Sequence, residues 1–130
     1  MDMEARMFKA YAKGDEKIQL KIISGHFITS QSHITHYLDM TTMKTRCAEA
    51  AQIARLLSAK YEATTPVDSI ICLDGLEVVG AFLAEELAKA GVLSMNAHKT
   101  IYIVTPEFHA NGQMLFRDNT QNMVKNRNTV

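Results

Sequence analysis

Hydrophobic residues near the start of the chain alternate with polar ones, which is the pattern of half-buried β-strands. The clearest alternation runs over residues 18–22, and short apolar runs follow at 27–28 and 34–38. A polar turn at 30–32 separates the last two runs. This period of two predicts a small β-layer within residues 1–40.

The residues before this layer have a different spacing. Met3, Met7, Phe8 and Tyr11 recur at intervals of three and four, and a glycine follows. This spacing predicts a short helix over residues 3–13 with one apolar side. Because Met and aromatic residues are enriched at interfaces, the apolar side either covers the β-layer or contributes to a homodimer.

Beyond residue 41 the pattern becomes helical and then alternates between strand and helix. Residues 42–57 place apolar side chains on one stripe of a helix: Met43, Cys47, Ala50, Ala51, Ala54 and Leu57. Continuous apolar strands at 69–75 and 99–105 flank a helix at 76–91, which predicts a βαβ unit in a parallel sheet covered on both faces. A loop at 106–113 and a short strand at 113–118 follow.

Composition adds mainly exclusions. Lys plus Arg and Asp plus Glu both number 14, so no basic field favours nucleic acid. The chain shows no apolar run of membrane-spanning length and no signal peptide, which favours a cytoplasmic protein. Cys47 and Cys72 lie in apolar surroundings without a CxxC spacing, so we expect two buried, reduced thiols.

The order of these segments resembles the first part of an orotate phosphoribosyltransferase. The residues that carry the resemblance are Gly25, Phe27, Ser30, Tyr37, Leu38 and Asp39, followed by DSIICLDGLEVVGAFLAEELAKAG and IYIVTPEFHANGQM. It implies an α/β, Rossmann-like phosphoribosyltransferase fold with a parallel central sheet. Residues 1–40 would be the N-terminal helix and hood, and 41–130 a βαβ core portion with a flap hairpin. Together they would form one incomplete domain, because the chain stops where another parallel strand should begin.

The resemblance also implies how a substrate would be held. In this family phosphoribosyl pyrophosphate, which carries Mg²⁺, donates ribose 5-phosphate to a pyrimidine base such as orotate. Its pyrophosphate would lie on the loop after the first core strand, at Asp74, Gly75, Leu76 and Glu77. A flap would cover it, with Thr105, Glu107, His109, Asn111 and Gly112 at matching positions. The third family element, an acidic strand with a Thr-Thr-Gly loop, is absent from these residues, so catalytic residues stay unknown.

The flap departs from the family pattern in charge. Thr105 and Pro106 stand where the family has Arg and Lys, and His109 stands at a second Lys position. Thr and Pro supply no charge, and a neutral His supplies at most one donor. Two functions therefore remain open: an active transferase, and a catalytically silent relative that binds a phosphoribosyl ligand or nucleotide. A bare Rossmann-like module acting through protein contacts is a third.

Each candidate residue also has a structural interpretation. Asp74 is a ribose or Mg²⁺ contact, or only a cap of the following helix. Gly75 and Glu77 are explained by turn geometry and by the helix dipole. Phe27 and Tyr37 would stack on the base, or simply pack in the β-layer.

Three histidines occur close together, at His26, His33 and His36. Side chains three apart on a strand point to opposite faces, and His26 lies across a turn from the other two. We therefore expect polar loop histidines, or a role in the ligand pocket or dimer contact, and no protein-only metal site.

Overall fold

The computed structural model describes the chain except for residues 1–3, 14, 30–31, 62–64, 90–94 and 110–112. The described part is a small mixed α/β structure with a short parallel sheet and two antiparallel sheets. Its elements in chain order are η1 (Glu4–Arg6), β1 (Met7–Ala12), β2 (Asp15–Ile28), β3 (His33–Asp39), α1 (Thr41–Thr45), α2 (Cys47–Ser58), β4 (Ser69–Ile71), α3 (Glu77–Lys89), β5 (Tyr102–Val104), β6 (Glu107–Phe108), β7 (Met114–Leu115) and α4 (Asp118–Val124). No helix in this part is long and apolar enough to cross a membrane.

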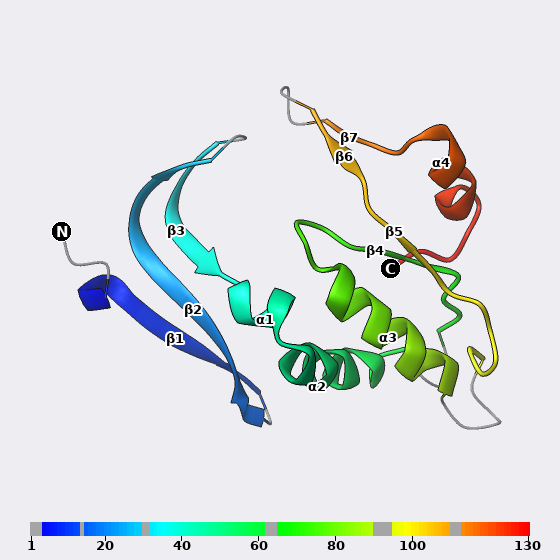
Figure 1. Ribbon diagram of the computed structural model, residues 1–130, viewed down its shortest axis with the longest axis horizontal. Helices are drawn as coiled ribbons and strands as arrows, with labels where there is room; N and C mark the ends of the chain where they lie inside the picture. The colour runs from blue at the N-terminus through cyan, green and yellow to red at the C-terminus, as the bar shows by residue number, and fades with distance from the viewer. Residues whose placement is uncertain (1–3, 14, 30–31, 62–64, 90–94, 110–112) are drawn as a thin grey trace.

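The first three strands form an antiparallel sheet with β2 in the middle, on one side of the molecule in Figure 1. The strands expected at 18–22 and 34–38 are confirmed, whereas 27–28 is the end of β2 rather than a separate strand. The pairing shifts register between Ser24 and Phe27, so a β-bulge interrupts the β2–β3 ladder there.

The helix expected over residues 3–13 is wrong. Of the described residues in this range, Glu4–Arg6 form a helical turn, and Met7–Ala12 pair with β2, with Phe8 opposite Ile22. A 14-residue strand offers a long row of main-chain partners, and this tertiary pairing overrides a weak local helix preference. In a strand Phe8 falls on the opposite face from Met7 and Tyr11, so the expected apolar stripe does not exist.

The helix expected over 42–57 is present but broken. Arg46, at φ −97° and ψ 110°, separates α1 from α2. Ala50 and Ala54 are fully buried as expected. Cys47, which begins α2 beside the break, is exposed, so its expected burial is wrong, while Cys72 is buried and both thiols are free.

The βαβ unit is present on a smaller scale than expected. β4 and β5 pair in parallel, with Ser69 opposite Tyr102, and α3 connects them. Each strand has three residues. Tyr102 and Ile103 stay 40% and 37% exposed, so the sheet is not covered on both faces. A large parallel central sheet is therefore not seen in the described residues.

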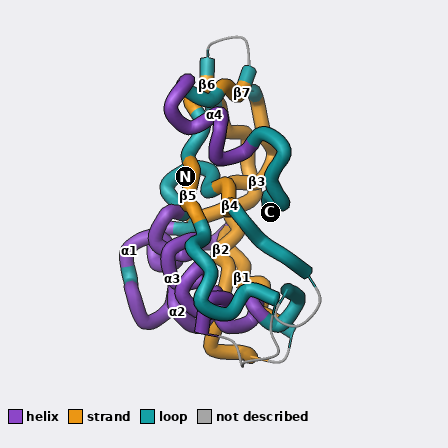
Figure 2. Tube along the Cα trace, turned by 90° about the vertical axis from the view of Figure 1, so that its right-hand side faces the viewer, coloured by secondary structure: helices purple, strands orange, loops and turns teal. Residues whose placement is uncertain are grey.

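The apolar core lies where α2, α3 and β4 meet, and both views show α2 and α3 side by side (Figures 1 and 2). Its buried members are Ala54, Val67, Ile70, Cys72, Leu83 and Leu87. A Cβ added at Gly80 of α3 would overlap the sulfur of Cys72. The absence of a side chain at Gly80 therefore sets how closely α3 approaches β4.

The C-terminal residues return to β4. Thr129 makes a parallel bridge with Ser69, and the N–H of Ile71 donates to the carbonyl of Val130 at 2.8 Å. The expected strand at 113–118 is shorter than predicted, because only Met114–Leu115 are paired and Asp118 already begins α4, a helix the hydrophobic pattern did not predict. The β6–β7 hairpin lies at the end of the molecule away from α2 (Figures 1 and 2).

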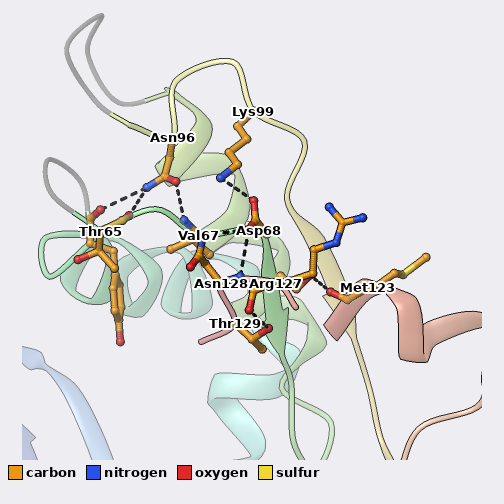
Figure 3. Close-up of polar contacts among 11 residues, drawn as sticks. Thr65, Val67, Asp68, Asn96, Lys99, Met123, Arg127, Asn128 and Thr129 are labelled. Atoms are coloured by element: carbon orange, nitrogen blue, oxygen red, sulfur yellow. Dashed lines mark hydrogen bonds and ion pairs between the residues drawn. The ribbon is translucent and has the colours of Figure 1, made fainter. Parts of the chain in front are cut away.

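Two polar side chains connect the loops around β4 (Figure 3). The fully buried Asn96 accepts from the N–H of Val67 at 2.8 Å and donates to the carbonyl of Thr65 at 2.8 Å. Asp68 accepts from the Lys99 ammonium at 2.6 Å and from the N–H of Asn128 at 3.0 Å. These contacts satisfy polar groups that would be costly to bury unpaired.

Candidate functional site

The candidate phosphate-binding loop, residues 73–76, joins β4 to the start of α3. Asp74 and Gly75 have φ of 49° and 81°, so two successive residues are in the left-handed region. The N–H of Leu76 donates to the carbonyl of Leu73 at 3.1 Å and closes the turn. The N–H of Gly80 donates to Leu76, which begins the helical bonding and leaves the N–H groups of the first turn to other acceptors.

A lysine from another element lies against this loop. The Lys44 ammonium of α1 is 3.2 Å from Oδ2 of Asp74, whose side chain is 89% exposed. The Cδ atom of Lys44 lies 3.3 Å from the position that a Cβ would take at Gly75. A cation is therefore held over the loop, with its stem packed against glycine backbone.

The sequence pattern does not single out Lys44. It is 30 residues from Asp74 in sequence, and the expected helix over 42–57 placed it only on a solvated face. The contact depends on the break at Arg46, which gives α1 a direction different from that of α2. No local sequence signal predicts this pairing.

Asp74 and Glu77 have different neighbours. The hydrogen bond found for the Asp74 carboxylate goes to Lys44, not to a backbone N–H of α3, so the capping interpretation of Asp74 is not supported. Glu77 is exposed on the first turn of α3. Burial, and then the negative charge of Glu77, raise the pKa of the Cys72 thiol, which makes Cys72 a poor nucleophile.

A cavity of about 290 Å³ opens beside the same loop. Residues of α2, β4, the segment 72–76 and α3 line it together with Val130; examples are Leu57, Ile70, Leu76 and Leu83. The walls are almost wholly apolar and present no charged side chain. A phosphate is therefore better placed outside the cavity, next to Lys44.

The proposed flap is the β6–β7 hairpin in part. Thr105 and His109 are exposed, and the main-chain N–H of His109 donates to the carbonyl of Gln113 at 3.0 Å, which closes the hairpin. Glu107 pairs with the guanidinium of Arg117. Asn111 and Gly112 lie outside the described residues. Arg117 is thus a cation beside the flap, but its guanidinium forms an ion pair with the carboxylate of Glu107.

The two candidate base-binding rings lie together. Phe27 and Tyr37 have ring centroids 5.7 Å apart at an interplanar angle of 42°. Tyr37 is 44% exposed, so this pair is not a closed core contact. Nearby, Asp39 accepts from the Thr41 hydroxyl and backbone N–H, and the hydroxyl bond is the main cause of its lowered pKa.

The histidines lie on the paired strands β2 and β3 rather than in a loop. His26 and His33 meet across the β2–β3 hairpin, with Nε2 and Nδ1 3.0 Å apart, and both are exposed. His36 contacts the hydroxyl of its neighbour Thr35 instead. Among described residues, no hydrogen bond or ion pair joins the histidines or the ring pair to the 73–76 loop.

Comparisons with protein-family models, curated proteins and solved structures find no match to this chain.

Proposed function

We propose that this chain is an orotate phosphoribosyltransferase-like protein that binds the pyrophosphate of phosphoribosyl pyrophosphate on the 73–76 loop. The position of Lys44 over Gly75 carries the proposal. A pyrophosphate is bound by cations and by hydrogen-bond donors such as the free N–H groups of a helix start. Both kinds of group lie at this left-handed turn. The proposed fold is the Rossmann-like phosphoribosyltransferase type.

The place of the loop in the fold supports this assignment. It follows β4, the middle strand between β5 and residues 128–130, and leads into the crossover helix α3. Ligands of open α/β sheets bind at the carboxyl ends of parallel strands, where such loops lie.

Mg²⁺ would arrive with the substrate. Among described residues, no group of three or more His, Cys, Asp or Glu side chains is arranged to hold a metal. The exposed carboxylate of Asp74 fits a supporting contact to a pyrophosphate-bound Mg²⁺, an oxygen-seeking ion that usually keeps several waters. In that arrangement Lys44 would turn from Asp74 to the pyrophosphate oxygens.

The aromatic pair supports a base-binding role for the N-terminal sheet. A half-exposed ring such as Tyr37 beside Phe27 offers the flat apolar surface on which a pyrimidine stacks. Because β3 leads through α1 to Lys44, the same segment would position base and pyrophosphate. The proposal includes a homodimer in the cytoplasm, without nucleic-acid or membrane partners.

The second candidate is binding without turnover, and the flap favours it. The segment lacks the family's cations at Thr105 and Pro106, and Arg117 is engaged by Glu107. Developing charge in the transition state would therefore find few preorganised donors on that side. A regulatory, ligand-binding relative needs only the 73–76 loop and Lys44.

Calorimetric titration with phosphoribosyl pyrophosphate and Mg²⁺ tests the proposal. We expect saturable binding by the 130-residue chain and weaker binding by K44A, by about 1.5–3 kcal/mol for a bond to a charged group. The exposed Lys60 at the end of α2 gives the matched control K60A, which should bind like the parent. No binding by the parent, or equal losses in both variants, would contradict it.

A turnover assay with orotate tests whether these 130 residues catalyse the transfer on their own. The Thr-Thr-Gly loop is absent from these 130 residues, so we expect no orotidine monophosphate from the chain as given. Binding without product agrees with this expectation, and measurable product would overturn it.

A further inference from the structure

We propose that His26 and His33 form a binding site for one divalent transition-metal ion of the class that imidazole prefers, such as Zn²⁺ or Ni²⁺. This site is separate from the proposed pyrophosphate loop. It lies on the β2–β3 hairpin, on residues that the proposed function does not use.

The β-bulge in β2 creates the pair. Ser24 lies opposite His36. Without the shift in register, His26 would lie opposite Ile34, and the side chains of Ile34 and His33 point to opposite faces of β3. After the shift Ile28 lies opposite His33, so His26, two residues earlier, is on the same face as His33. One extra residue therefore re-aims His26 toward its partner, which is a common role of bulges near functional sites.

The geometry of the rings suits a shared metal. Nε2 of His26 and Nδ1 of His33 are 3.0 Å apart, and the ring planes are inclined by 70°. Two nitrogens bound to one tetrahedral Zn²⁺ at about 2.0–2.1 Å would be separated by about 3.3–3.4 Å. A movement of a few tenths of an ångström converts the shared hydrogen bond into two metal bonds, with the bridging proton released to solvent.

Exposure decides the kind of site. Both rings are exposed, so water can complete the coordination shell around the two histidines, which are one protein ligand fewer than in an open catalytic zinc site. Imidazole nitrogen favours Zn²⁺, Ni²⁺ and Cu²⁺ over the oxygen-seeking Mg²⁺ and Ca²⁺. A bound ion would also fasten β2 to β3 and stabilise the folded hairpin.

Titration calorimetry with ZnCl₂ and NiCl₂ in a buffer that does not chelate tests the site. The C47S variant serves as parent, because the exposed Cys47 thiol is itself a metal ligand. We expect one ion per chain and a higher melting temperature with metal. H26A and H33A should each weaken binding at least about tenfold, because each removes half of the protein ligands, and the double variant should bind no better than either.

The matched control is H36A, because His36 lies three residues from His33 on the other face of β3. It should bind metal like the parent. The proposal is overturned if the parent shows no saturable binding up to millimolar metal, if H26A and H33A bind like the parent, or if H36A loses as much affinity as they do.

Discussion

Gly80 lies where α3 passes Cys72, and the fit leaves no room for a methyl group. The added Cβ of G80A would overlap the Cys72 sulfur. We expect G80A to lower the free energy of unfolding by about 1–3 kcal/mol through overpacking, although alanine favours a helix by about 1 kcal/mol over glycine. Denaturant unfolding measures the change.

The double variant C72A/G80A tests the cause. Removing the sulfur frees the volume that the new methyl group needs, so the double variant should be more stable than G80A alone. An unchanged or higher stability of G80A would show that α3 and β4 can separate at no cost.

Asp68 predicts a pH dependence of stability. The hydrogen bond from Lys99, followed by that from the backbone of Asn128, lowers the pKa of Asp68 from its ordinary value of 3.8. Asp68 therefore binds its proton more tightly in the unfolded chain than in the folded one. The stabilisation that the ionised Asp68 gives the folded state is present above pH about 4 and is lost as the pH falls toward the folded pKa.

The variant D68N should thus be less stable than the parent at neutral pH, and the difference should shrink as the pH falls below about 4. Thermal unfolding from pH 3 to pH 7 checks this. N122A, at an exposed position of α4, serves as control and should follow the parent. A constant difference between D68N and the parent would contradict the assigned cause.

At the scale of elements, hydrophobic periodicity predicted the helices and strands whose burial pattern is present in their own sequence. It missed the elements whose structure depends on residues distant in the chain. The amphipathic stripe around Ala50 and Ala54 and the apolar run of β4 are local signals. Both alanines are buried as predicted, and the strand is present but spans only Ser69–Ile71 of the expected 69–75. Residues 7–12 became a strand because β2 offered partners, a fact outside their own sequence. The Lys44 contact depends on the helix break at Arg46, and the His26–His33 pair depends on the bulge in β2. Neither irregularity could be predicted from the sequence pattern.

The β6–β7 hairpin provides a test at this scale. If it is a pyrophosphate flap without cations, the double variant T105R/P106K should tighten phosphoribosyl pyrophosphate binding by about 1–3 kcal/mol. Calorimetry with Mg²⁺ present measures the change. Two added charges on the exposed positions of α4, N119R/N122K, are the control for long-range attraction. Equal affinity of T105R/P106K and the parent would mean that the hairpin only connects elements.

For the whole molecule we predict a homodimer. β1 is an edge strand, and its Phe8 is 49% exposed, so main-chain groups and apolar area are both open to a second copy. Light scattering at micromolar concentration should give the mass of two chains. F8E should give one chain, and K9A, which changes the other face of β1, should not. A single-chain mass for the parent would refute the dimer.

The return of the last residues to β4 also has a kinetic consequence. The Asp68–Asn128 contact joins residues 60 apart, whereas α2 and α3 are close in sequence. Closing the longer loop loses more chain entropy before any contact forms, so we expect α2 and α3 to associate first and residues 128–130 to dock after the rate-limiting step. Substitutions at Asp68 should then speed unfolding and leave the folding rate nearly unchanged, which stopped-flow kinetics can measure.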